Sequence, residues 1–488
     1  MPDGAPSPTP QGVDVLSREE QKAHPLFTGR VKVYAKAIGG RVRSMKWAAL
    51  IILLGIYYIT PWIRWDRGPN APDQAVLVDM QGRRAYFFFI EIWPQEAYYL
   101  TGILILAAFG LFLATSLFGR IWCGFTCPQT VWTDLFMWVE RLIEGDRTVR
   151  MRLDNGPLTS DKIRKKVSKH GAWLVISLLT GGAWIMYFQD APAFVGRFFT
   201  GQSSAGTYFF VGLFTATTYL LAGWAREQVC TYMCPWPRFQ AALLDPESLV
   251  VTYERWRGEP RGKHKKGTSW DGRGDCIDCK QCVAVCPTGI DIRDGIQLEC
   301  IGCGLCIDAC NDIMAKVGRP PNLVTFDSEA NQARAAGGNE RQYKPVRPRT
   351  IAYSLILLAV AGVMVFGLVA RDSMEVTVIR DRNPLFVTLS DGSIRNGYQI
   401  RLLNKKREPV GVTLSVEGLE GALLSVVGQS DGGPIVLDAP ADGVATYIAH
   451  VAAPASALAG PENTLEFIAT DAAGERFVRA DIFRGPER

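Results

Sequence analysis

The sequence is poor in histidine and confines its cysteines to one region. Only four histidines occur among 488 residues. None lies inside an apolar run: His24, His170, His264 and His450. A membrane b-type haem needs histidines that face each other within the membrane, so no haem is expected. All twelve cysteines lie between Cys123 and Cys310, in short repeated spacings that indicate metal ligands rather than the disulfides of an exported domain.

Two further features are missing from the sequence. No long basic tract is interleaved with aromatic residues, so nucleic acid is not an expected partner. The first residues, MPDGAPSPTPQG, are too polar for the hydrophobic region of a signal peptide. The first apolar run is therefore expected to be an uncleaved helix that spans the membrane.

Long apolar runs indicate helices in contact with membrane lipid. A spanning helix needs roughly 20 apolar residues to cross about 30 Å of hydrocarbon. Five segments are candidates: 47–63, 98–119, 172–188, 207–224 and 351–370. The first and the third are short, and a buried core helix is the alternative for each. Trp and Tyr residues at their edges favour the membrane, because these side chains anchor at its interface.

The basic residues between these runs predict the orientation. Lys and Arg number eight in 1–46, four in 64–96, ten in 120–170, one in 190–206 and eighteen in 225–349. Because cytoplasmic loops carry the excess of positive charge, the three rich segments, including the N-terminal one, are expected in the cytoplasm. Five crossings of a bacterial inner membrane then place residues 371–488 in the periplasm.

The C-terminal part has the pattern of a β domain. Residues 371–488 contain short β-branched runs separated by Gly, Asn, Asp and Pro, such as YQIRLLNK and NTLEFIATD. This pattern predicts an Ig-like β-sandwich, although the Cys–Trp–Cys spacing of antibody domains is absent. Residues 321–348 are polar and are interpreted as a linker, which closes a cytoplasmic domain over 225–348.

Eight cysteines form the strongest motif. Two runs follow the spacing C-x2-C-x2-C-x3-C: Cys276, Cys279, Cys282 and Cys286, and then Cys300, Cys303, Cys306 and Cys310. In this spacing three cysteines of each run hold one [4Fe–4S] cluster and the fourth reaches the other cluster. The first cluster is therefore assigned to Cys276, Cys279, Cys282 and Cys310, and the second to Cys300, Cys303, Cys306 and Cys286. Zinc is the alternative, but it favours paired CxxC motifs.

Two such clusters predict transfer of single electrons. One departure from the pattern is Asn311, which stands where the first run has Pro287; it removes no ligand. The predicted fold class is a multi-domain membrane protein: a five-helix transmembrane bundle, a bacterial-type 2[4Fe–4S] ferredoxin domain and the Ig-like β-sandwich.

The other four cysteines form an internal repeat. Each pair follows an apolar run and has the form C-x3-C-P: Cys123 and Cys127, and Cys230 and Cys234. Proline disfavours a helical residue before it, so each pair is expected at a helix end, and two such ends would bring four thiolates together. Soft thiolates suit Cu(I), Zn or Fe–S centres, and Met233 would add a thioether. Buried packing cysteines and dithiol–disulfide redox couples are the alternatives.

Two acidic residues stand out on the expected outer side of the membrane. Glu91 and Glu96 lie in FFFIEIWPQEAYYL, just before the second apolar run. They are candidates for a quinol site or a metal path, although solvated interfacial side chains are the more common reading of such residues.

The combination of motifs resembles a known family. Five spans, two C-x3-C-P repeats, the segment CIDCKQCVAVCPTGIDIRDGIQLECIGCGLCIDAC and a β-rich tail resemble cytochrome cbb3 oxidase accessory proteins of the FixG/RdxA/CcoG type, from about residue 25 to the end. The membrane part is also similar to the ferredoxin subunits NapH and NosR. The resemblance implies reduction of Cu(II) to Cu(I) for maturation of a copper-containing oxidase, with oxidase subunits and copper-delivery proteins as partners. It also implies that the repeat cysteines are the redox or copper-binding set.

Three functions follow from this pattern. The first is a membrane cupric reductase, an oxidoreductase that supplies Cu(I) to oxidase assembly. The second is an electron relay from quinol to a protein partner, with no metal substrate. The third is a copper-binding assembly scaffold without catalysis. Nothing in the residues themselves selects copper over another electron acceptor.

Overall fold

A computed structural model describes residues 32–486, except 70, 266, 268 and 430–433. The N-terminal part of the predicted cytoplasmic segment 1–46 therefore lies outside the described residues. The chain forms two compact units. The first unit contains the residues up to Leu50, Ala114–Val175 and Tyr219–Pro345; the second contains Ile51–Leu113, Ile176–Thr218 and Val346–Arg488.

Four helical segments are long and apolar enough to cross a membrane: Arg41–Trp62, Pro94–Phe118, Ala205–Ala225 and Pro348–Val369. They contain α2 (Arg41–Ile59) with η1 (Thr60–Trp62), η2 (Pro94–Glu96) with α3 (Tyr98–Phe118), α8 (Ala205–Thr218) with η4 (Tyr219–Ala225), and α14 (Pro348–Val369). Four of the five expected segments fall within them. The remaining one, 172–188, covers the apolar end of α6 (Ser160–Ile185), whose first half carries several lysines.

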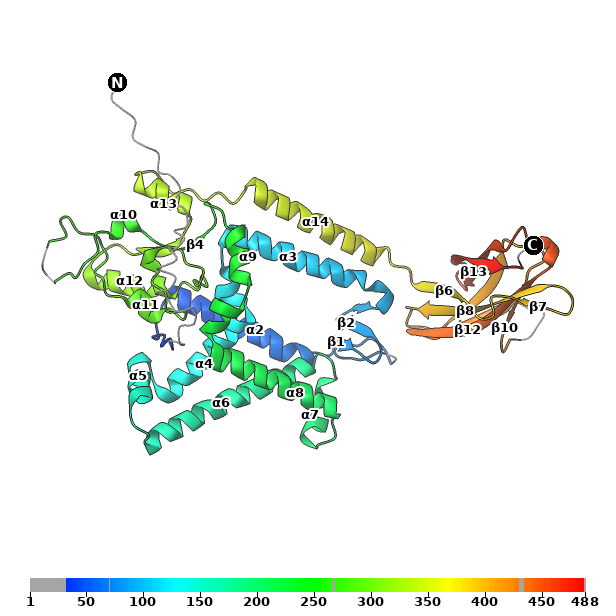
Figure 1. Ribbon diagram of the computed structural model, residues 1–488, viewed down its shortest axis with the longest axis horizontal. Helices are drawn as coiled ribbons and strands as arrows, with labels where there is room; N and C mark the ends of the chain where they lie inside the picture. Colours follow the sequence, from blue (N-terminus) through cyan, green and yellow to red (C-terminus); the bar gives the residue numbers. More distant parts are fainter. Residues whose placement is uncertain (1–31, 70, 266, 268, 430–433, 487–488) are drawn as a thin grey trace, which may run out of the picture. The chain divides into compact units, whose positions relative to one another are not determined.

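The helices α3 and α14 pack together in the second unit, and Figure 1 shows them side by side. The ring of Phe109 lies 6.1 Å from that of Tyr353. Closer to the start of α3, Gly102 leaves room for the Met364 side chain of α14. A Cβ at this glycine would lie 2.4 Å from the Met364 sulfur. Outward-facing side chains of both helices are exposed and apolar, as expected for helices solvated by lipid.

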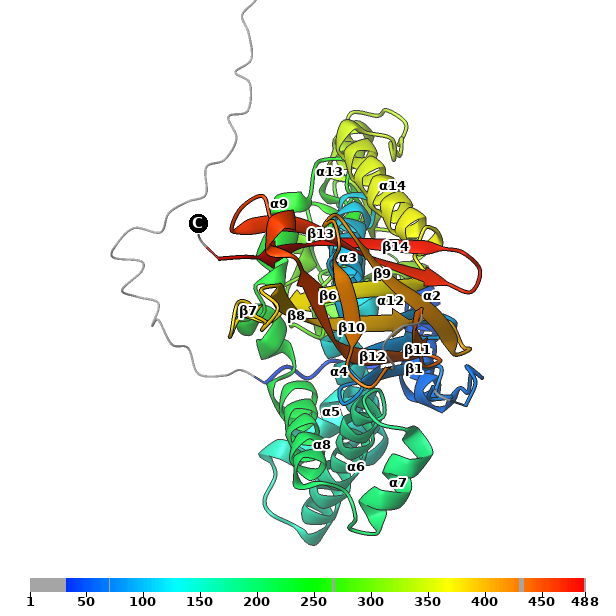
Figure 2. The ribbon, with the colours of Figure 1, turned by 90° about the vertical axis from the view of Figure 1, so that its right-hand side faces the viewer.

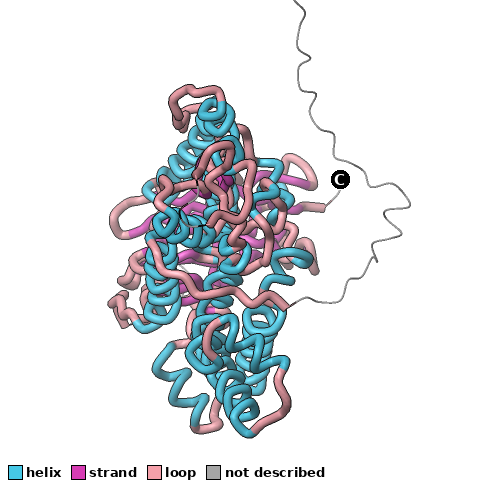
Figure 3. Tube along the Cα trace, turned by 90° about the vertical axis from the view of Figure 1, so that its left-hand side faces the viewer, coloured by secondary structure: helices cyan, strands magenta, loops and turns pink. Residues whose placement is uncertain are grey.

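The first unit is mostly helix and loop, with long loops between short helices (Figure 3). Its further elements are η3 (Trp122–Thr126), α4 (Pro128–Glu144), α5 (Arg147–Asn155), η5 (Val229–Met233), α9 (Trp236–Leu243), β4 (Val250–Tyr253), α10 (Arg255–Gly258), α11 (Gln281–Val285), η6 (Ile292–Asp294), α12 (Leu305–Val317), β5 (Val324–Asp327) and α13 (Glu329–Ala336). The interpretation of 321–348 as a linker is wrong for part of this range. Strand β5 pairs antiparallel with β4, and Ser328 caps α13.

The cysteine-rich helix α12 is joined to the start of the first apolar helix. Asp308 of α12 accepts hydrogen bonds from the backbone N–H groups of Val42 and Arg43, at 3.3 and 2.8 Å. These amides belong to the first turn of α2, where N–H groups have no partner within the helix. A carboxylate also interacts favourably with the positive end of the helix dipole. The α12 segment is thus fixed to α2 by a buried charge rather than by a flexible connection.

The second unit carries the β structure. A three-stranded antiparallel sheet contains β1 (Val76–Asp79), β2 (Arg84–Phe87) and β3 (Ile90–Ile92). This unit also contains the short helix α7 (Ala191–Phe199), which lies between α6 and α8 in the chain. The C-terminal domain contains β6 (Met374–Arg380), β7 (Val387–Thr388), β8 (Ile394–Asn404), β9 (Val410–Glu417), β10 (Leu423–Val426), β11 (Ile435–Ala439), β12 (Gly443–Ala453), η7 (Ala455–Ala457), β13 (Glu462–Asp471) and β14 (Arg476–Arg484).

The C-terminal strands form two sheets that pack face to face (Figure 2). One has the order β10-β12-β8-β6 with β7 at the edge of β8, and the other has the order β11-β9-β13-β14. Along β8 the buried positions alternate, from Ile394 to Leu402, as expected for a strand with one face in a core. Tyr398 and Phe467 meet across the two sheets with ring centroids 4.8 Å apart.

Buried ion pairs connect this domain to the segment before α3. Glu96 is only 4% exposed and binds Lys405 and Arg371, each at 2.7 Å. Arg84 of β2 pairs with Glu91 of β3, at 3.1 Å, and with Asp442. Glu91 and Glu96, which sequence analysis named as candidates for a quinol site or a metal path, are thus both held in ion pairs. Glu91 pairs with Arg84, and the partners of Glu96 lie in the C-terminal domain or next to it.

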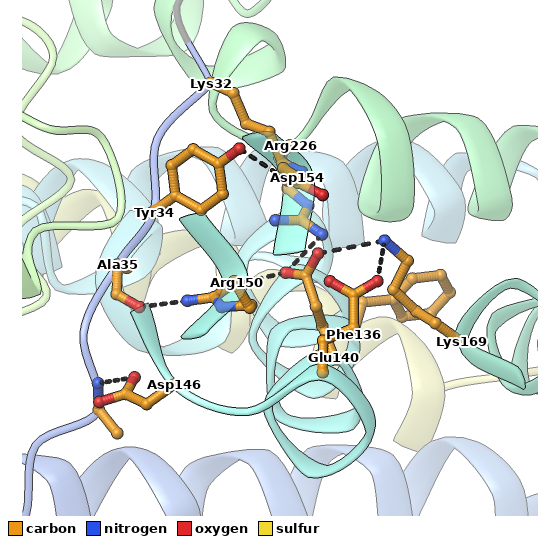
Figure 4. A network of polar contacts seen from close by, with 12 residues as sticks. Lys32, Tyr34, Ala35, Phe136, Glu140, Asp146, Arg150, Asp154, Lys169 and Arg226 are labelled. Atoms are coloured by element: carbon orange, nitrogen blue, oxygen red, sulfur yellow. Dashed lines mark hydrogen bonds and ion pairs between the residues drawn. The ribbon is translucent and has the colours of Figure 1, made fainter. Parts of the chain in front are cut away.

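A second buried charge network lies in the first unit (Figure 4). Glu140 of α4 accepts from Arg150 at 2.7 Å, and it also pairs with Arg226 at 2.9 Å and Lys169 at 3.4 Å. Burial would raise the pKa of Glu140, but Arg226, Lys169 and Arg150 outweigh it and lower this pKa to about 2. Because Arg226 immediately precedes the second cysteine pair, this carboxylate helps to position that pair against α4.

We expect Glu140→Gln to destabilise the first unit strongly. The substitution leaves three buried cations without their shared anion, which typically costs roughly 3–5 kcal/mol. Thermal unfolding of the detergent-solubilised protein, followed by circular dichroism, measures the loss. Asp161→Asn is the matched control, because Asp161 is about half exposed and pairs with two lysine or arginine side chains at the surface. Equal unfolding temperatures for the two variants would contradict this account of the network.

The pair of Glu91 and Asp442 predicts a pH-dependent stability. Burial and then the charge of Asp442 raise the pKa of Glu91 from 4.5 to about 7. The folded protein therefore binds this proton more tightly than the unfolded chain, and its stability should fall as the pH rises from 4.5 through 7. The loss is on the order of 2 kcal/mol. Glu91→Gln, which keeps the neutral form, should flatten the curve of unfolding temperature against pH, whereas Glu417→Gln on the exposed surface should not.

Candidate iron–sulfur and thiol sites

The structure brings the eight ferredoxin cysteines together in two sets. A hollow of about 360 Å³ is lined by Cys276, Cys279, Cys282 and Cys310. A second hollow is lined by Cys286, Cys300, Cys303 and Cys306, and also by Cys282. One cysteine of each run thus lines the hollow of the other run, because α11 and α12 pack against each other. The assignment of four ligands to each cluster stays a prediction.

The surroundings of both hollows fit iron–sulfur clusters. Burial raises the pKa of Cys303 and that of Cys310 to about 12, so these groups become thiolates only when a metal binds them. Left-handed backbone at Gly302 and Gly304, with φ near +70°, shapes the loop of the second hollow. In the described part of the chain, no three His, Cys, Asp or Glu side chains converge closely enough for a single metal ion. The cysteine thiols of each hollow surround a space rather than the position of a single ion.

Asn311, the residue that departs from the motif, has a structural role. Helix α12 continues through it, where proline would interfere with the helical hydrogen bonds. Its side-chain oxygen accepts from the N–H of Asn322 at 2.6 Å, and its amide nitrogen donates to the Asn322 side chain at 3.2 Å. Asn322 has a positive φ of 65°, so Asn311 stabilises the turn that leads into β5.

Each C-x3-C pair lies in a wide helical turn. In η3 the N–H of Cys127 donates to the carbonyl of Trp122, and in η5 that of Cys234 donates to the carbonyl of Val229, both at 2.8 Å. These are hydrogen bonds between residues five apart, a geometry found frequently at functional sites. Extended backbone at the second cysteine then ends each turn before its proline. The predicted position at a helix end agrees with this geometry.

The two turns bring their four thiols into one group. Burial, followed by the nearby Cys127 and Cys230, raises the pKa of Cys123 to about 12. Burial and the nearby Cys127 and Cys234 have the same effect on Cys230. A cluster of thiols with such raised pKa values favours a soft cation as its partner, because that cation stabilises the thiolates.

This thiol group lies directly against the second iron–sulfur hollow. Cys123 and Cys230 pack on a small apolar cluster that contains Cys303, with Cys306 also in contact. The backbone of η3 approaches the loop of Cys303 so closely that a Cβ on Gly124 would lie 2.7 Å from the carbonyl oxygen of Gly302. The packing leaves no room for a further side chain at this contact.

Three polar residues around the thiols were not identified from the sequence as functional. The Cys123 thiol donates to the side-chain oxygen of Gln240 at 3.1 Å, and Gln240 is fully buried. Gln129 donates to the carbonyls of Leu221 and Arg226, at 2.8 and 3.2 Å, and so joins the start of α4, after the first cysteine pair, to η4 and to Arg226, before the second pair. Arg120, three residues before Cys123, donates to the carbonyl of Cys300 at 2.8 Å. Of these three residues, only Arg120 belongs to a pattern in the sequence, because an arginine, Arg226, also precedes the second cysteine pair.

Met233 lies in η5 and is 62% exposed. Its role as a thioether ligand stays a prediction.

Comparison with known proteins identifies the same parts. A family model described as a 4Fe-4S dicluster domain matches residues 225–329, and one described as a 4Fe-4S binding domain matches 100–145, which includes the first cysteine pair. A third, for the IG-like fold at the C-terminus of FixG, matches 364–486.

Full-length relatives share this organisation. The chain is 50% identical to nitrogen fixation protein FixG of Rhizobium meliloti, over 92% of this chain and 91% of that protein. It is 46% identical to protein RdxA of Cereibacter sphaeroides, over 95% and 96%, and 46% identical to RdxB of the same organism, over 96% and 99%. A crystal structure of a FixG-related protein from Vibrio parahaemolyticus covers 23% of this chain and 96% of its own, with 23% identity and a TM-score of 0.20.

The chain thus combines 4Fe-4S domains with a FixG-type C-terminal domain and matches these relatives over almost all of its length, and it is an iron–sulfur electron-transfer protein that belongs to the FixG/RdxA family.

Proposed function

We propose that this protein reduces Cu(II) to Cu(I) at its four-thiol group, for the assembly of a cbb3-type cytochrome c oxidase. The observation that supports this proposal is that Cys123, Cys230 and Cys306 all pack on the buried apolar cluster that contains Cys303. Soft ligands and the second cluster site thus share one apolar cluster. Thiolates prefer Cu(I) to harder ions, so they favour the reduced product.

The proposed step moves one electron. A bound [4Fe–4S] cluster stores and releases single electrons. Cu(II) that binds the thiolates of Cys123, Cys127, Cys230 and Cys234 accepts one electron and becomes Cu(I), and the thiolates themselves are unchanged. Binding requires the four thiols to close around the ion, since no three described side chains of this kind converge closely enough for one metal ion. The lost electron is replaced by a donor of the quinol class. The Cys123 thiol gives up its proton on metal binding, and Gln240 then turns from acceptor toward donor, since its amide carries both groups.

The proposal includes a topology. Five crossings of a bacterial inner membrane are proposed, with the apolar end of α6 as the third. The excess of Lys and Arg in 120–170 and 225–349 supports a cytoplasmic position for both cluster sites. The N-terminus would then lie in the cytoplasm and the Ig-like domain in the periplasm. Oxidase subunits and copper-delivery proteins are the proposed partners.

Cys230→Ser should abolish copper-dependent oxidation without removing the clusters. The purified protein is reduced anaerobically with dithionite until its absorbance near 400 nm bleaches, excess reductant is removed, and Cu(II) is added with a Cu(I)-specific chelator. In the unsubstituted protein, recovery of absorbance should match Cu(I) formation one for one. In Cys230→Ser we expect the rate to fall at least about tenfold, because a soft ligand is lost.

Tyr232→Phe is the matched control, since Tyr232 lies in the same turn and is 73% exposed; it should behave as the unsubstituted protein. Clusters that stay reduced with Cu(II) but reoxidise with a quinone would favour the relay over the reductase. Copper binding and oxidase assembly that persist after the cluster cysteines are replaced would favour the scaffold.

A further inference from the structure

The guanidinium group of Arg120 binds the loop that carries Cys300 of the second cluster site. Its Nη1 donates to the carbonyls of Leu298 and Cys300, the latter at 2.8 Å, and its Nη2 donates to Pro237 of α9 at 3.1 Å. Arg120 is 6% exposed. Its backbone also supports the loop, since a Cβ on Gly302 would lie 3.1 Å from the Arg120 carbonyl oxygen.

Arg120 is a buried cation whose hydrogen bonds all go to neutral carbonyl groups. Among the described residues, no carboxylate lies within ion-pairing distance of it. Glu299 is the acidic residue that acts on it electrostatically, and the thiols of Cys300 and Cys123 act on it more strongly. A buried charge without a counter-ion is costly. The charge of Arg120 is therefore balanced when the second site holds an anionic cluster.

The first site has an arginine in a different electrostatic state. Arg293 approaches the Cys276 sulfur to 4.0 Å, but it also pairs with Asp278 and Asp291, each at 2.6 Å. Two carboxylates thus offset its charge. Burial also differs, since Cys279 of the first site is exposed and none of the four cysteines of the second site is. In charge, the sites differ by the cation at the second, which has no carboxylate partner among the described residues.

We propose that Arg120 raises the reduction potential of the cluster at Cys286, Cys300, Cys303 and Cys306 above that of the other cluster. Reduction adds one negative charge, and a buried cation beside that charge stabilises it. An electron that enters at the first cluster then moves to the second and is held there, next to the four thiols. Arg120 is thus a positioning residue that also sets the direction of transfer.

Electron paramagnetic resonance during an anaerobic redox titration tests this inference on the full-length protein. In Arg120→Gln, the ratio of reduced to oxidised second cluster should fall about tenfold at the potential where the unsubstituted protein is half reduced, which is about 59 mV for a one-electron couple. Arg120→Lys keeps the charge and should shift this step much less. Arg293→Gln should shift only the other step, which assigns the two signals.

Iron and sulfide analysis shows whether each variant assembles its clusters. If Arg120→Gln does not, Glu299→Gln provides the complementary test, because removal of this negative charge should move the same step in the opposite direction. The inference is overturned if Arg120→Gln with full clusters leaves the higher-potential step in place, or if Arg120→Lys shifts it equally. The titration contains no copper. If the titration shows the expected shift but the protein does not reduce Cu(II), the proposed function is rejected and this inference stands. If the protein reduces Cu(II) but the titration shows no shift, this inference is rejected and the proposed function stands.

Discussion

The close approach of two backbones, at Gly124 in the first cysteine turn and at Gly302 in the second cluster loop, is the constraint on which the rest of the site depends. A Cβ on Gly124 would lie 2.7 Å from the Gly302 carbonyl oxygen, and a Cβ on Gly302 would lie 3.1 Å from Arg120. Cys123, Cys230 and Cys306 all pack on the nearby apolar cluster of Cys303. Rates of electron transfer fall with distance through protein, so under the proposed function this close approach also favours transfer.

Charges hold this contact in place where apolar packing alone would not define its geometry. Asp308 binds the first turn of α2, Glu140 binds Arg226 before the second pair, and Gln129 joins the start of α4 to Leu221 and Arg226. Apolar surfaces can slide by small steps at little cost. A buried ion or amide that loses its partner costs several kcal/mol, so these contacts permit one arrangement of the thiols.

Much of this arrangement could be predicted from sequence. The interleaved ligand sets follow from the spacing of the eight cysteines, and the sandwich follows from the alternation of residues along strands such as β8. The wide turns, the roles of Gln129 and Gln240 and the strand in 321–348 could not be predicted. A lone glutamine has no sequence pattern, and β5 has only four residues, paired with a partner more than seventy residues away. The role of Glu96 was hidden for the same reason, since its partners Arg371 and Lys405 lie hundreds of residues later.

The internal repeat is symmetric in its cysteines and asymmetric in its charges. The residue three positions before the first cysteine of each pair is Arg120 in one copy and Glu227 in the other. Arg120 lowers the pKa of Cys123, opposing the effect of burial, whereas Glu227 adds to the effect of burial and raises that of Cys230. The pKa of both thiols is nonetheless raised to about 12, so the asymmetry lies in the contacts of the neighbouring arginines. Arg120 donates to the second cluster loop, whereas Arg226 pairs with Glu140. The duplicated motif has in this way acquired a polarity, because only the first of these arginines is bonded to that loop in the described part of the chain.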